Sequence, residues 1–168
     1  MDAIAVLGEG FSRIPDEARR ALRGLTAEQL VEAPGEGANS IGWLVWHLAR
    51  GQDAQVAAVA GTAQVYLQGE WAARFGRDPD PTDTGYGHEP DDVRAVRPES
   101  AEALLDYLDA VHAATRRYLG TLSADDLDRV VDEAWDPTVT LGVRLVSIVD
   151  DDLQHAAQAA YVRGLLGA

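Results

Sequence analysis

Two histidines and an aspartate are the residues of this sequence whose types and spacing are best suited to chemistry. His47 lies in the apolar segment 41–60, and Asp151 and His155 lie four residues apart in the alanine-rich segment 140–166. Residues four apart fall on one side of an α-helix, so this carboxylate and imidazole can act on one ligand. If the two segments are facing helices, two imidazoles and one carboxylate converge, which is a common ligand set for a divalent metal ion.

Three protein ligands would leave open positions on the ion, which is the feature that separates a catalytic metal site from a structural one. Purely structural interpretations stay open at this point. Asp151 could serve only to fix the tautomer of His155, and His47 could be a core histidine bonded to a carbonyl group. The run Asp150–Asp152 could be a solvated face, although Asp152, three residues before His155, can also reach its side of the helix.

The four long segments that would position these residues have a helical pattern. Apolar residues recur at spacings of three and four over 2–25, 41–60, 100–119 and 140–166. Pro15 interrupts the first of them, which predicts either a kink or a fresh start capped by Ser12. Thr26–Leu30 and Ser123–Asp126 predict short capped turns of helix.

The rest of the chain has weaker patterns. Residues 62–98 are irregular, apart from a short helix expected at 70–75, and 130–139 are expected to be extended or loop. No segment has the period of a strand over a useful length. The sequence therefore predicts an all-α four-helix bundle with a long crossover between the second and third helices.

Composition sets further limits. The chain has 168 residues, of which 46% are hydrophobic, and this predicts one domain over residues 1–168 with a substantial core. There is no cysteine, which excludes disulfides, thiolate metal sites and a nucleophilic thiol of the protein itself. The formal net charge is −14, and every basic residue is arginine. Such a charge disfavours binding to nucleic acids and to anionic membrane surfaces.

No apolar run approaches the length of a membrane span, and the N-terminal residues lack the basic region of a signal peptide. We therefore expect a cytoplasmic protein.

Two stretches resemble a known family. NSIGWLVWHLARGQDAQVA (39–57) and VDDDLQHAAQAAYVRGLL (149–166) are similar to the DinB superfamily, and within it to the actinobacterial branch known as DUF664. The resemblance extends from residue 24 through the last helix, and the paired tryptophans of the first stretch make that stretch the more specific one. It implies a four-helix bundle whose metal ligands are one histidine of the second helix and an H-x-x-x-H pair of the last.

Carried over position by position, this pattern implies His47 and His155 as metal ligands and places Asp151 where the family has its middle histidine. The resemblance to thiol-dependent members implies that a carboxylate can take that place. The family's H-x-G-Q segment departs here in its glycine, which is Ala157, and ends at Gln158.

The resemblance also implies a function. Members of the superfamily include transferases and isomerases that depend on low-molecular-weight thiols such as mycothiol and bacillithiol. The expected cofactors are therefore a divalent ion, zinc or nickel, and a small thiol, and the expected partners are that thiol and an electrophilic substrate. A homodimer is left open. Further pocket residues are proposed from their positions: Trp43, Trp46, Arg50, Gln158, Tyr161 and Arg163.

Two other functions are alternatives. The chain could be a non-enzymatic bundle whose metal is structural or lost, which the aspartate at 151 favours modestly. It could also be a metal-dependent hydrolase, in which the ion activates water rather than a thiol. The sequence does not separate such hydrolysis from thiol transfer.

Overall fold

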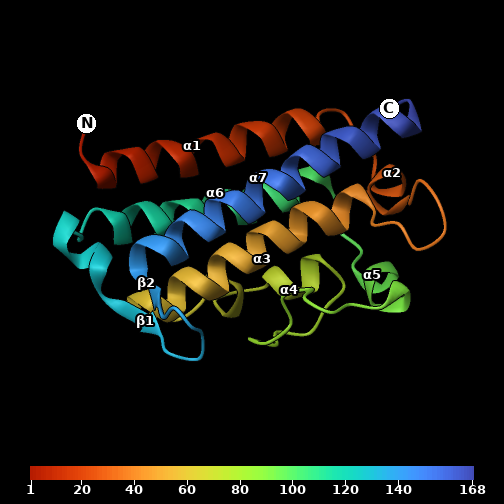
Figure 1. Ribbon diagram of the computed structural model, residues 1–168. Coiled ribbons are helices and arrows are strands. Elements are labelled where there is room, and N and C mark those ends of the chain that lie inside the picture. Colours follow the sequence, from red (N-terminus) through yellow and green to blue (C-terminus); the bar gives the residue numbers. More distant parts are fainter.

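Four long helices form a bundle around one hydrophobic core in the computed structural model, which describes residues 1–168 (Figure 1). The long helices are α1 (Ala3–Leu22), α3 (Ile41–Ala60), α6 (Ala101–Leu119) and α7 (Leu141–Leu166). The short elements are α2 (Ala27–Val31), η1 (Val65–Leu67), α4 (Trp71–Arg74), α5 (Pro90–Ala95), η2 (Ala124–Asp128), β1 (Val130–Asp132) and β2 (Val139–Thr140). The all-α bundle expected from the sequence is confirmed.

The direction of the helices explains the long crossover. Arg50 contacts Tyr107 and, further along both helices, Val59 contacts Tyr118, so α3 and α6 run in the same direction, whereas α1 and α7 run the opposite way (Figure 1). A chain that leaves the end of α3 must therefore travel back along a helix about 30 Å long before α6 can begin. Residues 61–100 do this, and they contain η1, α4 and α5. The sequence pattern had indicated only the helix at α4.

Side-chain caps begin the two helices that carry the candidate ligands. The hydroxyl of Ser40 accepts from the backbone N–H of Trp43 at α3, and that of Thr140 accepts from Val143 at α7. Helix α1 continues through Pro15 without a fresh start. The hydroxyl of Ser12 donates to the Glu9 carbonyl group and does not cap a new helix.

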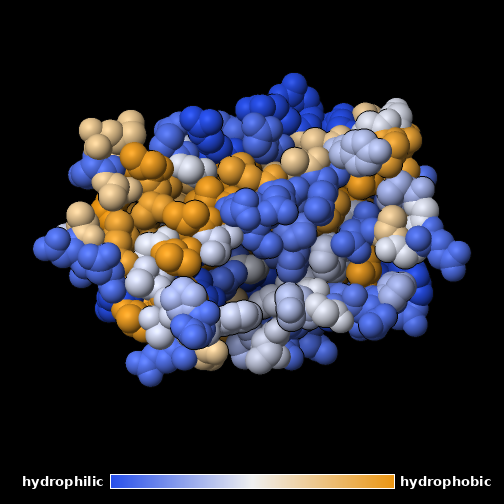
Figure 2. Space-filling model, viewed as in Figure 1, coloured by the Kyte–Doolittle hydropathy of each residue, from blue (hydrophilic) through white to orange (hydrophobic).

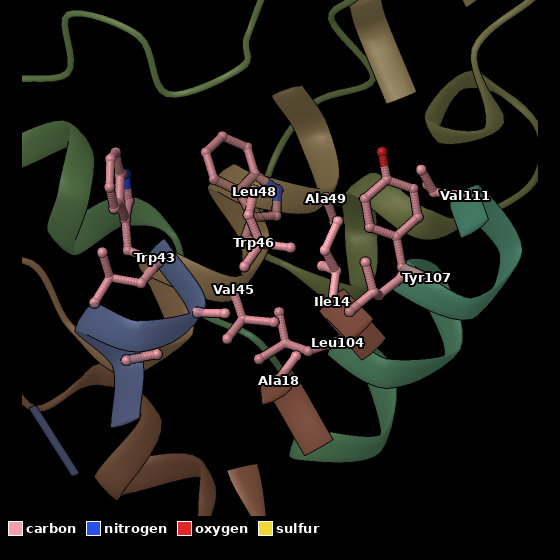
Figure 3. Close-up of a cluster of buried hydrophobic side chains, with 14 of the residues drawn as sticks. Ile14, Ala18, Trp43, Val45, Trp46, Leu48, Ala49, Leu104, Tyr107 and Val111 are labelled. Atoms are coloured by element: carbon pink, nitrogen blue, oxygen red, sulfur yellow. The ribbon is translucent and has the colours of Figure 1, made fainter. Parts of the chain in front are cut away.

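The core is built from facing sides of all four helices. Figure 3 shows Ile14 and Ala18 of α1 meeting Val45 of α3 and Leu104 of α6. The indole ring of Trp43 projects from α3 to the side opposite Ala18, toward the crossover (Figure 3). Helix α3 is buried along most of its length, since it packs on α7 and α6 and is also covered by the crossover.

Hydrophobic residues also gather on one outer face, over the first halves of α1 and α7 (Figure 2). Val6 of α1 and Val143 and Val146 of α7 are each more than half exposed. The homodimer considered from the sequence stays a prediction. No helix of the protein combines the length and the apolarity that crossing a membrane requires.

Two glycines in helices provide a test of this packing. A Cβ atom at Gly42 would lie 2.7 Å from the backbone oxygen of Leu30, whereas a Cβ atom at Gly8 would meet nothing within 4 Å. We expect Gly42→Ala to lower the free energy of unfolding by about 1–3 kcal/mol, since the α2 backbone must move. Gly8→Ala should raise it by about 0.4–1 kcal/mol, because alanine restricts the unfolded chain. Urea unfolding of both variants checks this, and shifts of the same sign would contradict the packing of α2 on α3.

Candidate metal centre

The structure brings together the three residues that the sequence singled out. One ligand atom from each of His47, Asp151 and His155 lies within 4.8 Å of the other two. The imidazole rings of the two histidines have centroids 4.6 Å apart and planes inclined by 78°. The cluster therefore joins α3 to α7, the two helices with the most extensive mutual packing in the bundle.

Helix geometry accounts for this convergence. Asp151 and His155 are separated by four residues of α7, and Oδ1 of the aspartate lies 3.5 Å from Nε2 of the histidine. Helix α3 runs antiparallel to α7, so Gly51, one turn after His47, faces the carboxylate one turn before His155. A Cβ atom built at Gly51 would lie 3.8 Å from Oδ2 of Asp151.

Each imidazole is held through its Nδ1 atom. Nδ1 of His47 lies 2.5 Å from the backbone oxygen of Thr84, and Nδ1 of His155 lies 2.9 Å from Oε1 of Gln158. Both partners are acceptors, so in each neutral ring Nδ1 carries the proton and donates it. Nε2 of His47 therefore keeps its lone pair, and Nε2 of His155 faces Oδ1 of Asp151, with which it shares a proton when the ring is charged. Orienting bonds at Nδ1 are the arrangement in which neighbouring groups commonly hold metal-binding histidines.

The pKa values reflect the same environment. Burial lowers the pKa of His47, and the bond to the Thr84 carbonyl group opposes this effect. The contact with Asp151 raises the pKa of His155, and the same contact lowers the pKa of Asp151. Burial thus favours the neutral form of His47, whereas Asp151 is ionised and stabilises a proton on His155. A bound cation would displace that proton.

The donor set fits a divalent transition metal. Bond lengths of about 2.0–2.2 Å to nitrogen and oxygen place the ligand atoms of one ion at most about 4.4 Å apart. The observed limit of 4.8 Å exceeds this maximum, so the side chains would have to move closer together to bind one ion. Two imidazoles and one carboxylate suit zinc, nickel or iron better than magnesium or calcium, which prefer oxygen ligands.

The other two histidines lie outside this cluster. Both ring nitrogens of His88 have partners, namely the indole N–H of Trp43 at 3.1 Å and Oδ1 of Asp83 at 2.9 Å. His112 lies on α6, beside Ser12 of α1.

Of the two arginines considered as pocket cations, Arg50 has another role, which corrects that expectation. Arg50 is fully buried and donates to the backbone oxygen of Asp83 at 3.0 Å. Arg163 donates to the backbone oxygens of Ala21 and Arg23 at the end of α1. The guanidinium of Arg50 is therefore not free to hold an anionic ligand.

The remaining expected pocket residues differ in exposure. Trp43 is buried and stacks on His47, with ring centroids 4.6 Å apart and planes inclined by 13°. Trp46 is also buried, and stacks on His88 rather than facing the ligand cluster. Tyr161 is 69% exposed, so it does not form the wall of an enclosed cavity.

Asp152 points away from the cluster, into the core. Only 1% of it is exposed, and neither carboxylate oxygen has a hydrogen-bond partner. Burial, with the charge of Asp151 adding to it, raises the pKa of Asp152 well above its usual range. Asp152 is therefore not a fourth member of the candidate ligand set.

Sequence reasoning missed the part of the crossover that covers His47. Residues 80–88 supply the Thr84 carbonyl group and the side chains of Asp83 and His88 around the ring and its neighbour Trp43. The one available signal was the density of glycine, proline and aspartate in this loop, which indicated either function or disorder and did not identify a partner.

Comparisons with known proteins agree with this architecture. The family model described as DinB superfamily matches residues 11–159. A crystal structure of a conserved protein from Enterococcus faecalis is similar over 100% of this chain and 99% of its own, with 33% sequence identity and a TM-score of 0.91. A search of curated proteins gave no match.

The buried carboxyl group of Asp152 predicts a pH-dependent effect on stability. Its pKa is raised by folding, so above pH 4 the unfolded chain is ionised at this position while the folded chain keeps its proton. Asp152→Asn should therefore stabilise the metal-free protein increasingly as the pH rises from about 4, by about 1.4 kcal/mol per pH unit until the raised pKa is reached.

Urea unfolding at several pH values in the presence of a chelator measures this. Asp150→Asn is the matched control, because Asp150 is exposed and bonded to Gln154. A stability difference between Asp152→Asn and wild type that does not change with pH would contradict the assignment of a neutral, buried acid.

Proposed function

The chain belongs to the DinB superfamily, and from that premise we propose that it binds one divalent metal ion through His47, Asp151 and His155. We further propose that the ion serves thiol-dependent S-transfer or isomerisation. The observation that carries the proposal is the convergence of the three ligand atoms, with the Nδ1 atoms of both histidines already bonded to groups outside the cluster.

The number of ligands supports a catalytic rather than a structural ion. Structural zinc sites use four protein ligands, whereas catalytic sites keep a position for water or substrate. The group found here has three members, and Asp152 is turned away from it. The side chain of Asp151 is 45% exposed, so a small molecule can approach the cluster from solvent.

The absence of cysteine supports a thiol that comes from outside the protein. A sulfur nucleophile cannot be supplied by this chain. A divalent cation supplies the chemistry required, because coordination favours the thiolate form of a thiol at neutral pH. The protein residues hold and orient the site: Asp151 contributes negative charge, and Trp43 packs on the ring of His47. Arg50 is fully buried and bonded to the crossover, so we do not assign the thiol's carboxylate to it.

Metal content tests the ligand set. We expect about one zinc or nickel ion per chain in tag-free wild-type protein after loading and desalting, and its loss in Asp151→Ala and in His155→Ala, since each removes one of three ligands. Elemental analysis measures this. Asp150→Ala and His112→Ala are matched controls that change the same residue types outside the cluster, and they should retain the ion. Wild-type protein without metal after incubation with zinc, nickel and ferrous ions would refute the proposal.

Thiol dependence needs a separate measurement. Metal-loaded protein is mixed with mycothiol and an aryl halide, and formation of the carbon–sulfur bond is followed with release of halide and of the thiol proton to buffer. We expect Asp151→Ala to lower the enzymatic rate, after subtraction of the uncatalysed reaction, at least about a hundredfold. Metal-ion catalysis contributes several kcal/mol, and this variant removes one metal ligand. Consumption of ester substrates at the same rate with and without thiol would instead indicate a hydrolase.

A further inference from the structure

The structure assigns a positioning function to the crossover loop 80–88: it fixes the tautomer and the ring orientation of His47, with Arg50 and Asp83 as the positioning residues that hold the loop in place. The inference deepens the proposed function, because its consequence for metal affinity depends on His47 being a ligand. Its first consequence, the protonation of Nδ1, can be measured without any metal.

The contact that sets the tautomer is a backbone one. The Thr84 carbonyl oxygen lies 2.5 Å from Nδ1 of His47 and can only accept, so this nitrogen carries the proton. Nε2 of His47 therefore keeps its lone pair, and it is the ring nitrogen left to act as a ligand with Asp151 and His155. A backbone carbonyl group cannot change its role with pH or rotate freely, which makes it a more rigid orienting group than a side chain.

Gly85 is what allows the loop to lie so close. Its φ is +90°, in the left-handed region, and a Cβ atom there would lie 2.7 Å from Nδ1 of His47. The same atom would lie 3.0 Å from the ring of Trp46 and 3.1 Å from that of Trp43. The backbone of Gly85 thus rests directly on the aromatic side of α3, and no larger residue fits without moving the loop or the imidazole.

Arg50 anchors the start of the loop to α3, the helix that carries His47. Its Nε donates to the Asp83 carbonyl oxygen at 3.0 Å, and its Nη2 donates to that of Pro81 at 3.4 Å and to Oε1 of Gln64 at 3.1 Å. The amide of Gln64 donates to the same Pro81 oxygen at 3.2 Å. Because this anchor lies three residues after His47, it places the loop on the ligand's own side of the helix.

The side chain of Asp83 links the loop to Arg77, which precedes it, and to His88 at its end. Its Oδ2 accepts two bonds from Arg77, at 2.9 and 2.7 Å, and its Oδ1 lies 2.9 Å from Nε2 of His88. Nδ1 of His88 accepts from the indole N–H of Trp43, so Nε2 of His88 carries the proton that Asp83 accepts. Since Trp43 stacks on His47, the network is connected to the candidate ligand at both its Nδ1 atom and its ring face.

The test compares two glycines of the same loop. Gly85 and Gly87 both have positive φ, so alanine is strained at either position, but a Cβ atom at Gly87 would meet nothing within 4 Å. We expect Gly85→Ala to lose the Nδ1–H form of His47 in nitrogen-15 NMR spectra of metal-free protein, and to bind zinc about 10–100-fold more weakly in a chelator competition assay. Gly87→Ala should match wild type in both measurements.

A second pair of variants covers the case in which Gly85→Ala does not fold. In Asp83→Asn one of the two acceptor oxygens becomes an NH₂ group, so Arg77 and His88 can no longer both donate to this side chain. We expect the same change in the His47 spectrum and about tenfold weaker zinc binding. Asp78→Asn, which changes an exposed acid two residues before the loop, is its control. Unchanged His47 spectra in both Gly85→Ala and Asp83→Asn would overturn the inference. If the tautomer changes as expected but wild-type protein binds no zinc, the positioning function stands and the proposed metal function fails.

Discussion

The burial of Arg50 is the constraint on which the rest of the site depends. Its guanidinium is fully buried, and a buried cation needs both a countercharge and acceptors for five N–H donors. Asp53 supplies the charge at 3.6 Å, the ring of Tyr66 lies 4.0 Å from Cζ, and the crossover supplies carbonyl oxygens, among them that of Asp83. The loop lies against α3 because this cation requires it, and the backbone beside His47 is held there as a consequence.

Three consecutive acids on α7 lie in three different environments. Each residue is turned by about 100° from the one before, so Asp150 is exposed, Asp151 faces α3 and Asp152 enters the core. The contact with His155 lowers the pKa of Asp151, while burial raises the pKa of Asp152 well above its usual range. The negative charge beside the imidazoles therefore comes from Asp151, and its neighbour in the core contributes a neutral acid whose burial costs stability.

The bundle and the ligand cluster could be predicted from the sequence because both depend on the helical period. The spacing of Asp151 and His155 placed them on one side of α7, and the resemblance to a known family supplied the facing helix with His47. The function of the loop could not be predicted in the same way. Arg50 contacts Asp83 across 33 residues of irregular chain, where no period relates the partners. An arginine in a helix is also usually exposed, so its sequence position gave no sign of complete burial.

The carboxylate in place of a third imidazole changes the charge that the candidate metal centre would carry. A divalent ion held by two neutral imidazoles and Asp151 would keep one net positive charge, whereas three imidazoles would leave two. Residual charge in a half-buried site is costly, and an anionic fourth ligand would cancel it, whereas a neutral one would not. Burial favours the neutral form of His47, and the Thr84 carbonyl group keeps its proton on Nδ1, so the charge of the set is fixed by Asp151. The donor set is for this reason better matched to an anionic fourth ligand, whether a thiolate or a hydroxide, than to a neutral one, and Asp151 is the residue that produces the match.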